Sequence, residues 1–137
     1  MSKISLYTDG GARGNPGPAA IGVVAYSGTE QLWTIKRYIG ETTNNQAEYQ
    51  ALIAGLTKAA GSSNELSCYL DSELVVKQLR GEYRVKDRGL QPLVRQVVTL
   101  LQKFSAVNFH HIAREKNKVA DHLVNEALDE HLAKSSK

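Results

Sequence analysis

Four acidic residues lie in short polar motifs that are spread along almost the whole 137-residue chain. They are Asp9, Glu48, Asp71 and Asp121. If the fold brings these carboxylates together, their mutual repulsion and loss of hydration require divalent cations beside them. A site of this kind is suited to metal-assisted chemistry on phosphate groups.

Each carboxylate also has a purely structural interpretation. Asp9 can open a hairpin turn with the two glycines that follow it, and Asp71 can cap a helix. Glu48 can pair with a lysine at the edge of the core, and Asp121 can complement a helix dipole. Helical spacing places Glu48 and Asp121 beside apolar residues, which weighs against the structural interpretation for these two. For Asp9 and Asp71 both interpretations stay open.

The first 61 residues have the pattern of three strands followed by a helix. Alternating apolar residues indicate strands at 3–9, 19–27 and 31–40. A loop rich in glycine and proline separates the first two over residues 10–18, and the three strands suit an antiparallel meander. Thr43 and Gln46 have capping-box spacing, which predicts a helix that starts at Thr43 and runs through Gln46 to Ala60.

The second half of the chain alternates strands with helices. Apolar runs indicate strands at 65–70 and 107–112. Capping residues and helical spacing predict three helices, from Asp71 or Ser72 to near Gly81, from Pro92 to Phe104, and from Lys118 to Ala133. Residues 134–137 are expected to form a frayed tail. Three strands followed by alternating helix and strand imply a mixed sheet with helices on its faces.

Length and composition favour a single domain that spans residues 1–137. No apolar run approaches the roughly 20 residues that a bilayer-spanning helix needs, and the N-terminus lacks the pattern of a signal peptide. We therefore expect a cytoplasmic protein without a membrane partner. The net charge is only +3, but basic residues concentrate over residues 77–103. This concentration suits either a polyanionic partner or a solvated surface.

The sequence around the carboxylates has a recognisable order of motifs. They are Thr8–Gly11 with Gly14–Pro18, then Thr42–Glu48, then Asp71–Ser72, then Arg114–Asn117 leading to Ala120–Asp121. In this order they resemble the motifs of the type 1 ribonuclease H family, and the resemblance covers essentially the whole chain. It implies an α/β fold, a five-stranded mixed sheet of order 3-2-1-4-5 in which strands 1–3 are antiparallel and helices flank the sheet.

The resemblance implies a nuclease, an endonuclease that hydrolyses the RNA strand of RNA–DNA hybrids and leaves 5′-phosphate and 3′-hydroxyl ends. It also implies that Asp9, Glu48, Asp71 and Asp121 bind two Mg²⁺ ions. One ion would activate the attacking water, and the other would stabilise the leaving 3′-oxygen. Oxygen ligands also suit Mn²⁺ and argue against zinc. The default oligomeric state is a monomer.

Seven further residues match positions at which the family contacts its substrate: Gly10, Gly11, Arg13, Asn15, Thr43, Asn44 and Asn45. The wide, shallow minor groove of a hybrid presents its 2′-hydroxyls to such groups. Thr43 matches a contact to a DNA-strand phosphate, but capping of the helix explains it equally well. Because these groups would contact sugars and backbone, we expect little base-sequence preference.

The chain departs from many relatives in two places. The segment 112–117 is short and has no histidine, which resembles an archaeal-like subgroup with an arginine in this region. Arg114 is therefore the predicted catalytic substitute. The connector 82–89 replaces an inserted basic helix and loop, so binding should be weaker. The broader specificity of that subgroup makes double-stranded RNA a second candidate substrate.

Two other functions compete with hydrolysis. The chain could be a catalytically weak or inactive module that binds hybrids or double-stranded RNA. The complete carboxylate set weighs against this, since a pure binding module gains nothing from negative charge beside phosphates. A junction resolvase or integrase of the wider superfamily is the third hypothesis. The Thr-Asn-Asn and Gly-Asn-Pro-Gly motifs argue against it, because they match the members that contact 2′-hydroxyls.

Overall fold

The computed structural model describes residues 3–135. Its strands are β1 (Ile4–Ala12), β2 (Gly17–Ser27), β3 (Glu30–Thr42), β4 (Glu65–Leu70) and β5 (Ala106–His111). Its α-helices are α1 (Asn44–Ala59), α2 (Glu73–Leu79), α3 (Gln91–Leu101) and α4 (Lys118–Ser135), and a 3₁₀ turn at Arg114–Lys116 precedes α4. Within the described part of the chain, every helix is too short or too polar to cross a membrane.

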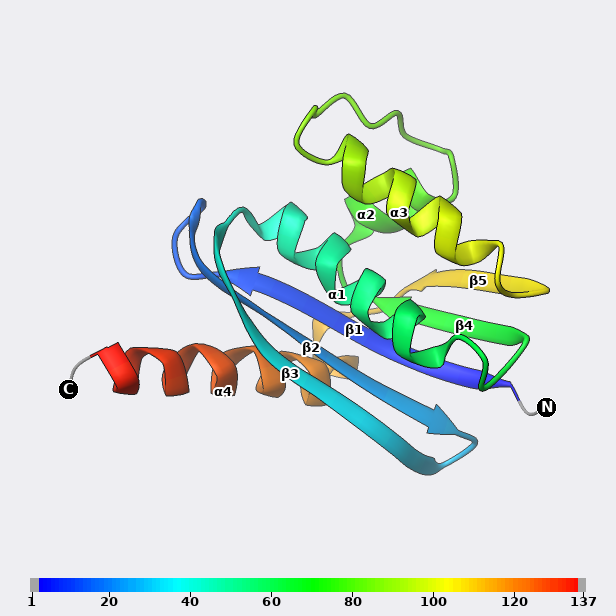
Figure 1. Cartoon of the computed structure of the whole chain (residues 1–137), viewed down its shortest axis with the longest axis horizontal. Helices are drawn as coiled ribbons and strands as arrows, with labels where there is room; N and C mark the ends of the chain where they lie inside the picture. The colour runs from blue at the N-terminus through cyan, green and yellow to red at the C-terminus, as the bar shows by residue number, and fades with distance from the viewer. Residues whose placement is uncertain (1–2, 136–137) are drawn as a thin grey trace.

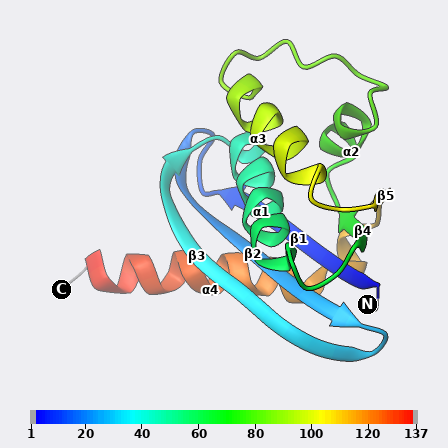
Figure 2. The ribbon, with the colours of Figure 1, turned by 45° about the vertical axis from the view of Figure 1, so that its right-hand side comes forward.

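The five strands form one sheet of order β3-β2-β1-β4-β5, which confirms the expected topology. β1 pairs antiparallel with β2 and parallel with β4, β2 pairs antiparallel with β3, and β4 pairs parallel with β5. Figures 1 and 2 show α1, α2 and α3 on one side of the sheet and α4 on the other. The central strand β1 therefore lies between two helical layers.

The main core fills the space between the sheet and α1. Leu52 and Leu56 lie one turn apart on α1 and are completely buried, together with Leu6 of β1 and Val23 of β2. Burying each such side chain contributes about 1.5–3 kcal/mol. This packing fixes the position and rotation of α1 against the two central strands.

The helix α4 packs on the opposite face through a smaller cluster that includes Ala20, Val124 and Leu128. At the outer strand β3, the Lys36 ammonium lies 2.6 Å from carboxylates of Glu126 and Glu130. The Tyr38 ring also stacks on His131 at a centroid distance of 3.6 Å. These polar and aromatic contacts fix the direction of α4 across β2 and β3.

The expected end of the first strand at Asp9 is wrong, because β1 continues through Gly10, Gly11 and Ala12. These residues keep their register with β2, where Ala12 pairs with Ala19, and the connecting turn spans only residues 13–16. The glycine at position 10 serves close packing, since a Cβ there would lie 2.3 Å from the backbone carbonyl of Ala47. Asp9 is therefore a strand residue with α1 beside it.

The start of α1 is as expected, because Thr43 caps the helix, with its Oγ1 accepting a hydrogen bond from the Gln46 amide. Other helix boundaries differ from expectation. α3 ends at Leu101, because a turn follows it before β5. α4 continues to Ser135, two residues past the expected end. Of the predicted frayed tail at 134–137, the last two residues lie outside the described part of the chain.

Candidate active site

The four carboxylates come from four different elements and line one cleft of about 320 Å³. Asp9 lies in β1, Glu48 in the second turn of α1, Asp71 directly after β4, and Asp121 in the first turn of α4. β4 stops pairing with β1 at Leu70, opposite Thr8. The continuation of β1 therefore leaves an opening at the carboxyl end of β4, which is where such sheets commonly bind ligands.

Three of the carboxylates form a tight group. One oxygen each from Asp9, Glu48 and Asp71 lies within 4.8 Å of the others. Asp9 and Glu48 are only 7% and 6% exposed, whereas Asp71 and Asp121 are half-buried. The Gly10 amide donates to Glu48 Oε1 over 3.2 Å, but Glu48 Oε2 receives no hydrogen bond from the described residues. A buried oxygen without a donor, beside two further carboxylates, suits a divalent cation.

Asn117 positions Asp71 and was missed as a site residue by sequence reasoning. Its Nδ2 group donates to Asp71 Oδ2 over 3.0 Å and to the Thr8 carbonyl over 2.9 Å, so it joins the ends of β1 and β4. The side chain is almost completely buried. An asparagine before a helix usually indicates a cap, which conceals this role in the sequence.

Asp71 does not cap a helix, which was the alternative to a role in the site. Ser72 caps α2, because its Oγ accepts a hydrogen bond from the Val75 amide over 3.3 Å. The carboxylate of Asp71 turns instead to the cleft, where Asn117 holds it. The role of N-cap and the role of site carboxylate are thus divided between two neighbouring residues.

Burial strongly disfavours negative charge in the cleft. It is the main reason that the pKa of Asp9 is raised to about 7. A hydrogen bond with Glu48 opposes this rise, and the charges of Asp71 and Asp121 add to it. Burial and then the charge of Asp9 raise the pKa of Glu48 well above its usual value. The carboxylates therefore resist simultaneous ionisation unless positive charge is supplied.

We expect the free energy of unfolding of the metal-free protein to fall as pH rises from about 4 to about 7. Native Asp9 keeps its proton up to about pH 7, whereas the unfolded chain loses it near pH 3.9. The native state therefore binds more protons in this window, so stability decreases as pH rises. Compared with the Asp9→Asn variant, the wild-type protein should lose at most about 4 kcal/mol of its free energy of unfolding over this pH range.

Urea denaturation in EDTA at pH 5 and pH 8 measures this effect. The Asp9→Asn variant serves as the reference, because it lacks the titrating group but keeps all other carboxylates. If the free energy of unfolding changes by the same amount in the wild type and in the variant between the two pH values, the pKa of Asp9 is not raised.

Five of the seven expected substrate residues line the same cleft: Gly10, Gly11, Arg13, Asn44 and Asn45. Asn15 and Thr43 do not line the cleft, and the side chain of each accepts a hydrogen bond from a backbone amide. Asn15 Oδ1 accepts a hydrogen bond from the Asn44 amide over 2.9 Å, and Asn44 Oδ1 accepts one from the Ala12 amide over 2.8 Å. These two bonds tie the β1–β2 turn to the start of α1, so this part of the rim is preorganised.

Two arginines at the cleft differ in how they are held. Arg13 reaches α4, where its Nη2 lies 2.8 Å from Asp129 Oδ1 and 3.4 Å from the carbonyl of Asn125. Arg114 lies at the mouth of the cleft, with its Nη2 3.5 Å from Asp121 Oδ1 and its side chain 78% exposed. Arg13 is thus anchored to the protein, whereas Arg114 keeps most of its guanidinium in solvent.

Comparison with known proteins gives consistent matches. A family model described as reverse transcriptase-like matches residues 7–127. A Mycobacterium tuberculosis protein described as bifunctional is 41% identical over 93% of this chain, but the chain spans only 36% of its length. A ribonuclease H of Pseudomonas entomophila is 36% identical, and the match covers 93% of this chain and 94% of that protein.

A solved structure of similar length adds to these matches. It is a crystal structure of an RNase H1 in complex with an RNA/DNA hybrid. It superposes on this chain with a TM-score of 0.90 at 45% identity, covering 94% of this chain and 99% of that one. The likeness therefore extends over almost the whole length of both chains.

Proposed function

Because the chain belongs to the type 1 ribonuclease H family, we propose that it hydrolyses the RNA strand of RNA–DNA hybrids with bound divalent metal ions. The convergence of four carboxylates in one cleft carries this proposal. A module that only bound nucleic acid would be weakened by such a concentration of negative charge beside phosphates. The proposed functional unit is the single domain of residues 1–137.

The four carboxylates are the proposed metal ligands, with Mg²⁺ as the expected ion and Mn²⁺ as the alternative. When bound, two such ions would supply an activated water and stabilise the charge on the leaving 3′-oxygen. Within the chain, Gly10 orients Glu48 through its amide, and Asn117 orients Asp71. Burial by α1 keeps water away from Asp9 and Glu48, which strengthens their attraction for cations.

Arg114 is proposed to assist the reaction from the mouth of the cleft. Its contact with Asp121 places a permanent positive charge beside the proposed metal ligands, and its exposure leaves it free to meet a phosphate. A guanidinium does not exchange protons near neutral pH, so its contribution would be electrostatic. This role differs from proton transfer by a histidine, which segment 112–117 lacks.

The rim formed by the β1–β2 turn and the start of α1 is the proposed minor-groove contact. Asn45 and the backbone of Gly10 and Gly11 face the cleft, and the hydrogen bonds of Asn15 and Asn44 hold this rim in place. Polar groups that are fixed in advance lose little entropy on binding. Thr43 is proposed to stabilise the rim by capping α1, in addition to any contact with a DNA phosphate.

One cleavage experiment tests the proposal directly. A single end-labelled sequence is presented as RNA–DNA hybrid, double-stranded RNA, single-stranded RNA and double-stranded DNA, with Mg²⁺, Mn²⁺ or EDTA. We expect metal-dependent cutting of the RNA strand in the hybrid, and the double-stranded RNA lane tests the second candidate substrate. Hybrid binding without cutting in either metal would favour the inactive binding module. Sedimentation of the same sample tests the expected monomer.

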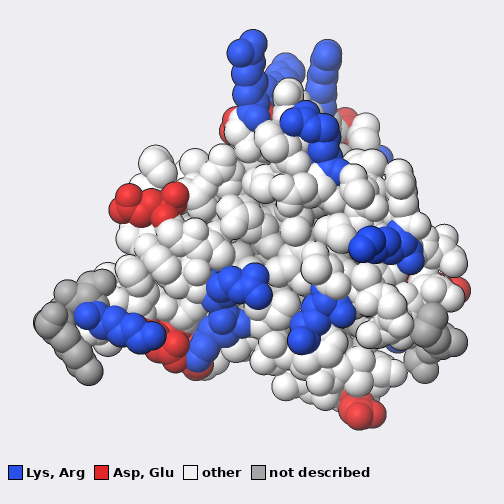
Figure 3. Space-filling view, viewed as in Figure 1, with Lys and Arg blue, Asp and Glu red and all other residues white. Residues whose placement is uncertain are grey.

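The connector between α2 and α3 is the proposed surface for additional phosphate contacts. Arg84 and Lys86 are exposed there, and Figure 3 shows basic side chains projecting at the top of the view, where Figure 1 places this connector. The double variant Arg84→Ala with Lys86→Ala should raise KM several-fold with little change in kcat, because these groups lie away from the carboxylates.

Steady-state kinetics at low and moderate salt measures the effect of the double variant. Its salt dependence should be shallower than that of the wild type, since fewer counterions are released on binding. The variant Arg95→Ala, on the exposed side of α3, serves as a control that removes one basic charge outside the connector. An unchanged KM in the double variant would remove the connector from the binding surface.

A further inference from the structure

A row of aromatic side chains crosses the face of the sheet on which α4 lies. Tyr26, Tyr7, Tyr69 and His110 come from β2, β1, β4 and β5, and we call them the aromatic row. Tyr7 stacks on Tyr69 at a centroid distance of 4.7 Å, and Tyr69 stacks on His110 at 5.0 Å. Tyr26 meets Tyr7 edge to face at 5.7 Å. The stacked rings of Tyr7, Tyr69 and His110 cover one another's faces, so the row presents ring edges across the sheet and ring faces only at its ends.

α4 covers only part of the aromatic row. It packs on β1, β2 and β3, and Figures 1 and 2 show it running away from β4 and β5. All four members of the aromatic row remain partly exposed. Partly exposed rings grouped on one face are a common mark of a binding surface.

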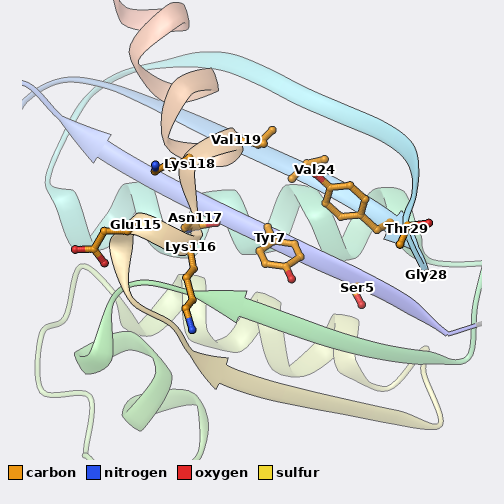
Figure 4. A pocket seen from close by; sticks show the side chains of 11 residues that line it. Ser5, Tyr7, Val24, Gly28, Thr29, Glu115, Lys116, Asn117, Lys118 and Val119 are labelled. Atoms are coloured by element: carbon orange, nitrogen blue, oxygen red, sulfur yellow. The ribbon is translucent and has the colours of Figure 1, made fainter.

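A groove of about 440 Å³ lies at one end of the aromatic row. Tyr7 and Tyr26 line it from the sheet, and Lys116 and Lys118 line it from the segment that leads into α4. Figure 4 shows Lys116 extending from that segment across the sheet, beside Tyr7. Neither lysine forms an ion pair with another described residue, so both are available to an anionic ligand.

The groove adjoins the carboxylate cleft. Tyr7 and Asp9 lie on the same face of β1, so their Cα atoms are about 7 Å apart along the strand. Asn117 forms the boundary, since it lines the groove and also holds Asp71 in the cleft. A strand of nucleic acid that left the cleft at this side would meet the lysines first and the rings next.

We propose that the aromatic row and its groove bind single-stranded RNA that continues the RNA strand of a hybrid beyond the duplex. The inference rests on the proposed function and specifies its substrate class as hybrids with a single-stranded RNA flank. An unpaired base can stack at the end of the row that borders the groove, whereas the bases of a duplex are already stacked on one another. The two lysines complement the phosphates of such a flank. Because stacking requires no particular base, the preference should be independent of sequence.

The test measures binding of four hybrids to the Asp9→Asn protein, in which turnover is prevented, by fluorescence anisotropy with Mg²⁺. The four hybrids share one duplex. The first has no flank, the second has a 5′ RNA flank, and the third has a 3′ RNA flank. The fourth has whichever of these two flanks binds more tightly, with its bases removed. A flank at one end should lower Kd about ten-fold, and removal of its bases should abolish the gain. Adding Tyr26→Val and Lys116→Gln should reduce the gain to about two-fold without changing Kd for the blunt hybrid.

A matched control and a second measurement complete the test. Tyr83→Leu removes an exposed aromatic ring from the α2–α3 connector, where any effect on duplex binding would change Kd for blunt and flanked hybrids alike and leave the ten-fold gain intact. Equal Kd values for blunt and flanked hybrids, or a gain that survives Tyr26→Val with Lys116→Gln, would overturn the inference. A concentration-dependent dimer that Tyr26→Val abolishes in sedimentation would also overturn it, and would assign the surface to a second copy of the chain.

Failure of the proposed function has a different signature. It would appear as no cleavage of the blunt hybrid by the wild-type protein, whatever the effect of a flank on binding. Normal cleavage of the blunt hybrid without any effect of a flank would instead contradict only the role of the aromatic row.

Discussion

Replacing Asp9 with asparagine is expected to lower hydrolysis of the hybrid by on the order of 10⁴-fold or more, because catalytic groups that act as a unit fail together. The same variant should unfold at a higher temperature than the wild type at pH 8 in EDTA. Asparagine has nearly the shape of aspartate but no charge, so it removes the cost of burying a charge, which is the main cause of the raised pKa of Asp9, and the repulsion from Asp71 and Asp121. Loss of activity together with a gain in stability distinguishes a site residue from a structural one.

Single-turnover cleavage and thermal denaturation measure the two effects on the same protein sample. Glu30→Gln is the matched control, since it removes an exposed carboxylate at the β2–β3 turn, far from the cleft. It should change neither activity nor stability appreciably. Retained hydrolysis by Asp9→Asn with Mg²⁺ would refute the assigned site, and a large loss of stability would mean that the carboxylate has a structural role.

The variant Gly10→Ala is expected to destabilise the protein by about 3 kcal/mol or more and to abolish activity with it. The added Cβ would lie 2.3 Å from the Ala47 carbonyl carbon and oxygen and 2.6 Å from the Glu48 amide. These are backbone atoms of α1, so only a shift of the whole helix relieves the contact. Such a shift would break the hydrogen bond from the Gly10 amide to Glu48 and move that carboxylate.

Gly11→Ala provides the matched control on the same strand. Its Cβ would meet only Val124, at an ordinary contact distance of 3.7 Å, so stability should change little. Urea denaturation of both variants gives the comparison. If Gly10→Ala were as stable as Gly11→Ala, the close approach of α1 to β1 would not be required for the fold.

Much of the fold could be predicted from local pattern. Period-two alternation and helical spacing gave every strand and helix, and the Thr43–Gln46 spacing correctly located the cap of α1. The strand order followed from the family motifs rather than from the pattern. The end of β1 was predicted wrongly because a local preference of Asp-Gly-Gly for turns was outweighed by pairing with β2 and packing on α1.

The sequence motifs predicted which carboxylates lie in the cleft, but not which residues position them. The motifs identify all four carboxylates, whose roles remain predictions. No local pattern indicates that Asn117 holds Asp71, because Asn117 follows β5 and meets Asp71 only through the parallel pairing of β4 with β5 and with β1. The aromatic row was missed for the same reason. Its members are single residues on four strands, and they become neighbours only when the register of the sheet is known.

Each of the four carboxylates comes from a different helix or strand, or from the residue directly after one. The cleft is therefore incomplete until all of these elements have folded together. During synthesis, the chain gains Asp9, Glu48 and Asp71 early, but Asp121 emerges only after all five strands. A nascent chain that lacks α4 therefore holds three carboxylates without the fourth and without the helix that helps to cover them. Activity should appear only when the last helix docks, and local detachment of α4 should silence the enzyme before the sheet unfolds.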